Sequence, residues 1–519
     1  AAFHLTTKVA SVHAGGHKFL FQSSIGPVQD FISAARRPRD LWFGSNMLSE
    51  VAKAAAKEVK NNGGNLIFPA PETNKDLEID SDLNVANVIL AEFEIDDKHK
   101  VNFNEISDKA LKAAKERLKI YANRVFRKME KRIVKEIWEI QLDDIIEFYS
   151  AWVPIDKDYI TARSNVARLL AARKNIRDFQ ANKCKYNVNK SSLDGLRESV
   201  LVKDLQDIPK DVKIKENEYL DAIGLIKRVP DENDVKFMAI TDTAFDATEV
   251  LPEYPYIAFI CADGDKMGAT LSAMKTAEEH RKFSRQLSKF ARLARDKVRK
   301  NLGTCVYTGG DDVLAFVPLD KALKCSRELH DLFAKIMSDY DVSLSVGMSI
   351  AHAKELLSEL LDFSREAEKI AKGTDRNGLA ISLRARGNLG FSIREQWKSE
   401  SKYDENSKLS ELSLDDRIEY FAECFENNKI PVKFPYELRE NAKFYKNWND
   451  TDKNVLREAI VNDVTRIFSN KGITIKNIGD YIKSKVKNSE TLIEFANELI
   501  FAQWVGASKK EKFPTLKQQ

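Results

Sequence analysis

The sequence is poor in the features that mark secreted and membrane-spanning proteins. Only five of its 519 residues are cysteine and none of them forms a C-x-x-C pair, so neither a disulfide framework nor a zinc ribbon is expected. No run of about 18 apolar residues is present, so no membrane-spanning helix is predicted. The N-terminus also lacks the apolar segment of a signal peptide. These absences predict a cytoplasmic protein with no membrane partner.

An excess of charge of one sign is lacking as well. The chain has 83 Lys and Arg against 79 Asp and Glu, which leaves a formal net charge of +4, and 31% of its residues are charged. A global basic field for nucleic acid is therefore absent, although local basic patches are compatible with this composition. With 43% hydrophobic residues, the length predicts a globular protein of about three or four domains.

One glycine-rich acidic turn is the most informative stretch of the sequence. Two apolar segments, Leu302–Tyr307 and Val313–Val317, are predicted strands, and Gly309–Gly310 between them permits the positive φ angles of a tight hairpin turn. Asp311 and Asp312 follow the glycines directly. Taken alone, this stretch fits an acidic surface turn as well as it fits a functional site.

A second stretch strengthens the functional interpretation of the turn. Tyr256–Ala262 is a short apolar run, predicted to be a buried strand, that ends in Asp263-Gly264-Asp265. A helix with one apolar face follows, formed by Phe283, Leu287, Phe290, Ala294 and Val298. In a βαβ arrangement this strand and the hairpin lie side by side. We therefore expect Asp263, Asp311 and Asp312 to meet at one edge of a sheet.

Bare carboxylates that meet at one edge repel one another. At a separation of about 4 Å and an effective dielectric of about 20, each pair costs roughly 4 kcal/mol, and a divalent cation removes this penalty. Hard oxygen ligands favour Mg²⁺ or Mn²⁺, and two such ions between carboxylates are typical of nucleotidyl transfer. We therefore predict that Asp263, Asp311 and Asp312 are metal ligands and catalytic residues, with Asp265 a weaker candidate.

The order of predicted elements repeats along the chain. The first set is strand, helix, two strands, helix and strand, at Lys18–Ser23, Val28–Ala35, Asn65–Pro69, Val85–Phe93, Leu111–Ile133 and Ile145–Val153. The same order recurs between Tyr256 and Leu383, and only this second set carries the carboxylates. The sequence thus predicts an α+β protein with two ferredoxin-like units. Residues 156–250 are predicted to be helical or irregular, and residues 389–519 helical.

The segment Ala35–Ser45 carries several basic residues. It combines three arginines with Trp42 and Gly44 and ends at Ser45. Arginine beside an aromatic ring suits phosphate or RNA, so Ser45 is included among the nucleotide-binding candidates. A solvated helix end anchored by Trp42 is the alternative.

Several motifs together resemble the large, polymerase-like subunit of type III CRISPR effector complexes, Cmr type. Ile25–Ile32, followed by Ala35–Arg37 and Arg39–Trp42, resembles the opening of that subunit. Asp263–Gly268 and Gly309–Asp312 resemble its second palm domain. The resemblance implies an N-terminal segment at 1–17, a first palm-like domain at 18–155, a helical or irregular domain at 156–250, a second palm domain at 251–388 and a helical domain at 389–519.

The resemblance also implies an activity and partners. When a complex of guide RNA and other Cmr-type subunits binds target RNA, the palm pair of such proteins joins ATP into a signalling nucleotide, in most relatives a cyclic oligoadenylate. Some relatives instead join ATP to S-adenosylmethionine. By the same resemblance, two divalent ions lie at the carboxylates, and the nucleotide-binding residues are Gly264, Asp265, Gly309, Gly310, Lys372 and Arg384.

Two departures from the family limit what is expected. Relatives commonly carry an N-terminal HD nuclease, but only 17 residues precede the first palm, so no DNA-cutting activity is expected. Relatives often have a zinc knuckle near Lys183–Asn187, where Cys184 stands alone, so no zinc is expected. A catalytically inert scaffold and a stand-alone diguanylate-cyclase-like enzyme are the alternatives. The intact carboxylates disfavour the first, and the doubled palm disfavours the second.

Overall fold

The computed structural model describes residues 17–28, 31–32, 34–95, 101–176, 188–202, 208–209, 212, 214–215, 217–229, 256–353, 355–385, 390–398, 408–446, 448 and 452–510. The chain divides into two compact units. The first comprises Ala1–Ala34, Phe43–Pro230 and Gly268–Ser288, and the second comprises Ala35–Trp42, Asp231–Met267 and Lys289–Gln519. Cys184 of the expected zinc-knuckle region lies outside the described residues, and so does part of the helix predicted at Val28–Ala35.

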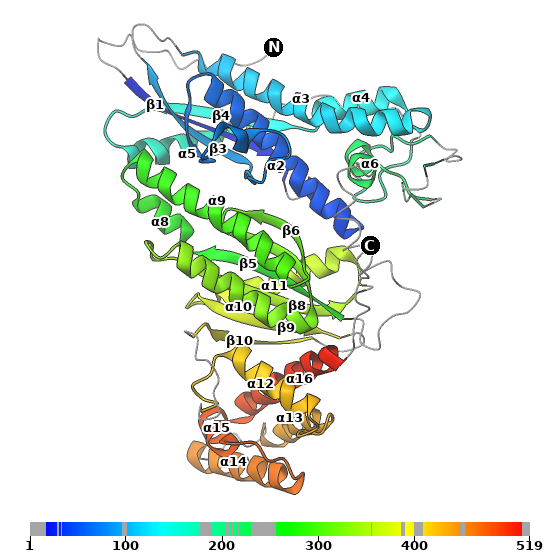
Figure 1. The fold of residues 1–519 in the computed structure, drawn as a ribbon, viewed down its shortest axis with the longest axis vertical. Helices are drawn as coiled ribbons and strands as arrows, with labels where there is room; N and C mark the ends of the chain where they lie inside the picture. Colours follow the sequence, from blue (N-terminus) through cyan, green and yellow to red (C-terminus); the bar gives the residue numbers. More distant parts are fainter. Residues whose placement is uncertain are drawn as a thin grey trace. The chain divides into compact units, whose positions relative to one another are not determined.

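The first unit is built on a four-stranded antiparallel sheet (Figure 1). Its strands are β1 (His17–Gly26), β2 (Asn65–Phe68), β3 (Val88–Ile95) and β4 (Glu147–Pro154), in the order β2-β3-β1-β4. This arrangement confirms the first predicted ferredoxin-like repeat. The long helices between the strands are α2 (Pro38–Asn61) and α3 (Phe103–Met129). A buried ion pair joins them, because Nη1 of Arg117 lies 2.6 Å from Oε2 of Glu50.

The second unit contains a six-stranded sheet whose first four strands repeat the same order (Figure 1). The strands are β5 (Tyr256–Asp265), β6 (Thr304–Gly309), β7 (Asp312–Pro318), β8 (Ser343–His352), β9 (Gly378–Arg384) and β10 (Phe391–Gln396), in the order β10-β9-β8-β5-β7-β6. All neighbouring strands are antiparallel except β8 and β9, which are parallel. The second predicted repeat is therefore confirmed, with β9 and β10 added at one edge.

Helices complete both units. Three connect the strands of the second sheet: α9 (Ala277–Lys300), α10 (Leu319–Ile336) and α11 (Leu357–Lys372). The remaining described helices are α4 (Lys135–Asp144), α5 (Tyr159–Asn175), α6 (Ala222–Arg228), α8 (Met267–Ala273), α12 (Leu414–Glu426), α13 (Phe434–Tyr445), α14 (Lys453–Asn470), α15 (Ile478–Lys485) and α16 (Ser489–Lys510), with two short 3-10 turns at Asn74–Leu77 and Glu130–Arg132. None of the helices in the described ranges is long and apolar enough to cross a membrane.

Two differences from the predicted elements have physical causes. The helix predicted at Leu111–Ile133 begins at Phe103 and ends at Met129, because the side chain of Asn102 accepts a hydrogen bond from the backbone of Glu105 and caps the helix start. Strand β10 is not predicted, because only one of its six residues, Ile393, is buried. Such an edge strand lacks the apolar alternation that a sequence pattern can detect.

A buried histidine in the first unit couples its packing to pH. His280 lies in the N-terminal part of α9 and is only 7% exposed, with its Nδ1 atom 2.8 Å from the hydroxyl of Tyr159. Burial, aided by the positive charges of Arg163 and Arg281, lowers the pKa of His280 to about 4. The folded state therefore holds this imidazole neutral, whereas the unfolded chain protonates it near pH 6.5.

We predict that His280→Gln flattens the acid dependence of stability. Because the folded pKa of His280 is depressed, its contribution is complete above about pH 6.5 and is lost as the pH falls towards 4, by up to about 3 kcal/mol. Urea unfolding between pH 4.5 and 7.5 should therefore show a steeper loss in wild type than in the variant. Tyr159→Phe is the control, since it retains the buried imidazole and should keep the wild-type slope. Equal slopes in wild type and His280→Gln would contradict this account.

Candidate active site

Three carboxylates converge where β5 ends and the β6–β7 hairpin turns. Ala262 of β5 pairs with Val313 of β7, so the next residues along the two strands, Asp263 and Asp312, lie beside each other. One side-chain oxygen from each of Asp263, Asp311 and Asp312 lies within 4.8 Å of the other two, and all three residues are half-buried. The predicted convergence of these residues is thus present. Among the described residues, this is the one group of three or more His, Cys, Asp or Glu side chains placed to hold a metal ion.

Two glycines allow the carboxylates to approach. Gly310 has a φ of +68° in the hairpin turn, a conformation that glycine adopts without steric cost. A Cβ atom at Gly264 would lie 2.7 Å from Oδ2 of Asp311, so a side chain there would displace this carboxylate. The backbone of Gly264 also forms a hydrogen bond with the Asp311 carboxylate. In this structure Gly264 therefore provides the space and one backbone contact for Asp311.

The proton affinities of the three carboxyl groups reflect their crowding. Burial, together with the nearby charge of Asp263, raises the pKa of Asp311 to about 6. Burial and a hydrogen bond with Asp263 raise the pKa of Asp312 further above its usual range. At Asp263 burial acts in the same direction, but the hydrogen bond with Asp312 and the ion pair with Lys372 outweigh it and lower the pKa. The cluster therefore resists carrying three negative charges without a cation beside it.

Lys372 supplies a positive charge at the cluster. It lies at the last turn of α11, where its Nζ atom forms an ion pair with Asp263 and a second one with Glu368, at 2.8 Å. Gly347 of β8 makes this position possible, because a Cβ atom there would clash with the backbone of Glu368. Glu368 is a site residue that the sequence analysis missed. The sequence pattern that could have identified Glu368 is its spacing of four residues from Lys372 on one helix.

Asp265 is placed differently from the other three aspartates. It is 1% exposed, and its Oδ2 atom accepts hydrogen bonds from the hydroxyls of Ser343 and Ser345, both at 2.8 Å, and from the backbone N–H of Asn377 at 3.0 Å. These contacts tie the end of β5 to β8 and to the turn before β9. The hydrogen bonds of Asp265 therefore stabilise the backbone around the site.

The structure does not bring Arg384 to the carboxylates. Arg384 pairs with Ala351 of β8, which pairs with Ile257 of β5, six residues before Asp263. At about 3.3 Å per residue, this places Arg384 roughly 20 Å along the sheet from the cluster. It forms an ion pair there with Glu366.

Arg376 is the nearer arginine. It lies in the turn between α11 and β9 with a φ of 59°, and its side chain is exposed. Its positive charge is one of the influences that lower the pKa of Asp263. A non-glycine residue in this conformation is strained, which the surrounding hydrogen bonds must offset. One of these joins the guanidinium of Arg394 to the backbone carbonyl of Arg376, at 3.2 Å.

Ser45 and His330 have surroundings that are typical of residues with a packing role. Ser45 lies on α2 in the first unit and is only 7% exposed. His330, which precedes Asp331 in the sequence, stacks on the ring of Trp397 and lies 3.0 Å from the side-chain oxygen of Asn377. The His330–Asp331 pair, the one His-Asp dipeptide in the sequence, therefore serves packing in α10.

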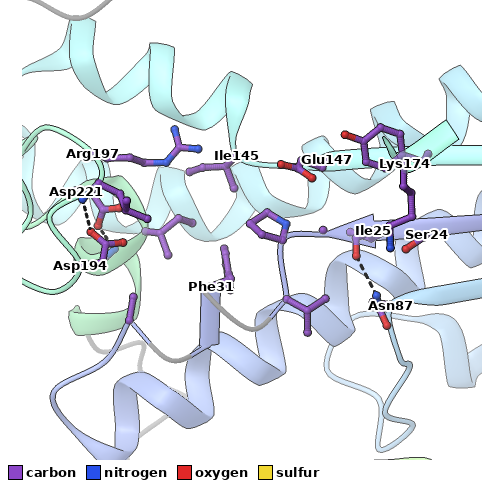
Figure 2. Close-up of a pocket in the computed structure, with 18 residues that line it drawn as sticks. Ser24, Ile25, Phe31, Asn87, Ile145, Glu147, Lys174, Asp194, Arg197 and Asp221 are labelled. Atoms are coloured by element: carbon purple, nitrogen blue, oxygen red, sulfur yellow. Dashed lines mark hydrogen bonds between the residues drawn. The ribbon is translucent and has the colours of Figure 1, made fainter. Parts of the chain in front are cut away.

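The corresponding edge of the first sheet has different chemistry. Ile25 and Asn87 occupy the paired positions that Asp263 and Asp312 hold in the second sheet, with the N–H of Ile25 donating to the carbonyl of Asn87 at 2.8 Å. A pocket of about 460 Å³ opens there (Figure 2). Apolar side chains that include Phe31 and Ile145 line its middle, and Glu147 lies between them and Lys174. This edge therefore lacks the carboxylate pair of the second sheet.

Two family models match the chain in the regions of the two sheets. Residues 256–380 match the second palm domain of Cas10/Cmr2, and residues 20–140 match the N-terminal domain of the CRISPR-associated protein Cmr2. The first match contains the carboxylate cluster and Lys372. The second contains most of β1 and all of β2 and β3.

Individual relatives agree with these matches. The CRISPR system Cmr subunit Cmr2 of Pyrococcus furiosus is 26% identical over 210 residues, which cover 34% of this chain and 24% of that protein. The match thus spans about a quarter of the curated relative. Among solved structures, the type III-B Cmr-beta complex bound to cognate target RNA contains a chain with a TM-score of 0.62 and 13% identity, covering 94% of this chain and 83% of that one. The Csm1–Csm4 cassette in complex with cA4 gives 0.51 and 12%, covering 94% and 70%.

The doubled ferredoxin-like fold, in whose described residues the three-carboxylate cluster lies on the second sheet only, defines the class of palm-domain proteins. Within that class, the two family models and the curated relative point to Cas10/Cmr2. Residues 20–140 and 256–380 of the chain are similar to the Cmr2 N-terminal domain and to the Cas10/Cmr2 second palm domain, respectively.

We predict that Gly347→Ala destabilises the second unit by about 1–3 kcal/mol, because the added methyl group forces α11 away from β8. Urea unfolding measures the change. Gly479→Ala in α15 is the matched control, since a Cβ atom there meets nothing within 4 Å, and it should be neutral or stabilise by up to about 1 kcal/mol. A Gly347→Ala variant as stable as wild type would show that α11 does not pack this closely.

Proposed function

We propose that the chain is the catalytic large subunit of an RNA-guided type III complex and joins ATP by metal-dependent nucleotidyl transfer. The observation that carries this proposal is the convergence of Asp263, Asp311 and Asp312 within 4.8 Å, inside the region that matches a Cas10/Cmr2 second palm domain. The solved relatives support the nucleotide class, since Csm1–Csm4 cassettes were determined with cA4 and with pppApA. The proposed product is a cyclic oligoadenylate.

The three carboxylates fit the group that such a reaction requires. Asp263, Asp311 and Asp312 offer hard oxygen donors. Because these carboxylates are close together and repel one another, a divalent cation such as Mg²⁺ or Mn²⁺ suits the site. When bound, the ions would neutralise triphosphate oxygens and make a ribose hydroxyl a better nucleophile. Two ions are proposed because nucleotidyl transfer typically uses a pair.

The residues around the carboxylates have separate tasks in this proposal. A ribose hydroxyl of one ATP attacks the α-phosphate of another, a new P–O bond forms, and the bond to the β-phosphate breaks to release pyrophosphate. Lys372 and Arg376 place positive charge next to the cluster, where the departing phosphates need it. Gly264 and Gly309–Gly310 keep side chains away from the reacting groups, because each is located where the backbone borders the carboxylates.

The proposed partners are the other Cmr-type subunits, a guide RNA and a target RNA. The support is the similarity in fold to a chain of the type III-B Cmr-beta complex, which was determined bound to cognate target RNA. Assembly with these partners would place the synthesis of the signalling nucleotide from ATP under the control of target-RNA binding.

The decisive experiment changes the turn carboxylates. We predict that Asp311→Ala combined with Asp312→Ala lowers product formation from labelled ATP by at least 10²–10³-fold, since the variant loses two of its three metal ligands. Folding and binding of target RNA should stay at wild-type levels, because the flanking strands remain and repulsion is relieved. The assay uses the assembled complex, with and without S-adenosylmethionine.

Glu458→Ala combined with Glu494→Ala is the control, as it removes two exposed carboxylates from the same unit. Product formation at the wild-type rate in the Asp311 and Asp312 variant would remove the carboxylates from catalysis. Product that depends on S-adenosylmethionine would replace the cyclic product with an adenylylated one. Full activity of the isolated chain without RNA would point to a stand-alone cyclase.

A further inference from the structure

Helix α9 concentrates positive charge in a chain that is nearly neutral. It carries nine basic residues against three acidic ones. The basic residues are Arg281, Lys282, Arg285, Lys289, Arg292, Arg295, Lys297, Arg299 and Lys300. A local field of this kind is the electrostatic footprint of a nucleic-acid-binding surface.

The part of α9 that belongs to the second unit has one apolar and one charged face. Phe290, Ala294 and Val298 are fully buried or nearly so, and the Phe290 ring packs edge to face against Phe333 of α10 at 4.9 Å. The exposed residues of this part are Lys289, Arg292, Asp296, Arg299 and Lys300. They recur at spacings of one, three and four residues, so they lie along one side of the helix, opposite the packed face.

Three of these charges are available to a partner. Lys297 lies 3.5 Å from Glu328, and Arg299 lies 4.0 Å from Asp296, so their charges are partly compensated. Across the ranges that the structure describes, no residue forms an ion pair with Lys289, Arg292 or Lys300. We call these three residues the cationic stripe. It extends about 17 Å along the helix axis at 1.5 Å per residue.

We propose that the cationic stripe binds the phosphodiester backbone of single-stranded RNA. The occupant follows from what the surface offers: every exposed side chain of α9 from Lys289 to Lys300 is charged, and none is apolar or aromatic. A protein partner would need an apolar centre for its interface, whereas phosphate contacts need only positive charge. Each of the three cations in the stripe can contact one phosphate of a bound strand. The choice of RNA over DNA rests on the proposed function.

No residue of the stripe belongs to the carboxylate cluster or is among the charges that shift its pKa values, so the proposed contribution of the stripe is affinity for RNA and not chemistry. Contacts of lysine and arginine with phosphates position a strand without reading its sequence. The expected binding is therefore independent of sequence and falls steeply with salt, because counterions are released from the strand.

The test measures binding of the full chain to a labelled unstructured RNA at several salt concentrations, by fluorescence anisotropy. Lys289→Gln, Arg292→Gln and Lys300→Gln together should weaken binding about tenfold or more at low salt. They should also reduce the slope of log affinity against log salt by about 2, at about 0.7 per phosphate contact. The variant with Lys289→Arg, Arg292→Lys and Lys300→Arg retains the charge and should bind as wild type does.

Lys453→Gln, Lys483→Gln and Lys487→Gln remove the same charge from exposed positions of the helical region and are the control. An equal loss in this control, or wild-type affinity and slope in the stripe variant, would overturn the proposal. Tighter binding of DNA of the same sequence would overturn the choice of RNA, and displacement of the RNA by polyglutamate at equal charge would assign the surface to an acidic protein.

The outcome is separable from that of the proposed function. If the wild-type complex makes no nucleotide product, the proposed reaction fails while RNA binding by the stripe can still be measured. If the stripe variant binds RNA unchanged, the RNA surface fails while nucleotide synthesis is unaffected. Thermal unfolding of each variant should give the wild-type midpoint, because all the substitutions are at exposed positions.

Discussion

Repulsion among three half-buried carboxylates is the constraint on which the second unit depends. Asp263, Asp311 and Asp312 are held within 4.8 Å although burial alone raises the cost of ionising each of them. The fold compensates with the ammonium group of Lys372, the backbone contact from Gly264 and a hydrogen bond between the carboxyl groups of Asp263 and Asp312. A cation suits a site arranged in this way, since a bound ion would relieve the repulsion among the carboxylates.

The position of Lys372 depends in turn on close packing between a helix and a sheet. Gly347 allows the backbone of α11 to approach β8, and a Cβ atom at Gly378 would likewise clash with the carbonyl of Ala371. Two glycines on neighbouring strands thus set the height of one helix above the sheet. The end of that helix then places its lysine beside Asp263, so backbone packing determines the electrostatics of the site.

The parts of this arrangement that local sequence controls could be predicted. The hairpin follows from Gly309–Gly310 between apolar segments, and the convergence of the aspartates follows from strands that neighbour one another in a repeated order. Asp265 and Arg384 show where such reasoning stops. The three hydrogen bonds of Asp265 come from residues about 80 to 110 positions away in the chain, and no local pattern encodes them.

Arg384 illustrates a different limit, which comes from strand direction. It follows Lys372 closely in sequence, but β9 runs parallel to β8 and so carries Arg384 away from the end of β5. Glu368 was missed for the opposite reason: its spacing from Lys372 is a common helical ion pair, and only the nearby Asp263 gives it a place in the site. Tertiary placement decides both cases.

The two sheets show how one fold can carry a carboxylate cluster in one copy and not in the other. Their strand orders agree, yet Ile25 and Asn87 stand where Asp263 and Asp312 stand in the second sheet. The first sheet therefore avoids the repulsion that the second must compensate, and it has no need of a lysine at the same place. Its edge instead borders a pocket with an apolar middle and with charged side chains on either side of it (Figure 2). Because fold alone does not determine activity, the different residues at this edge give the two sheets different capacities to hold a cation.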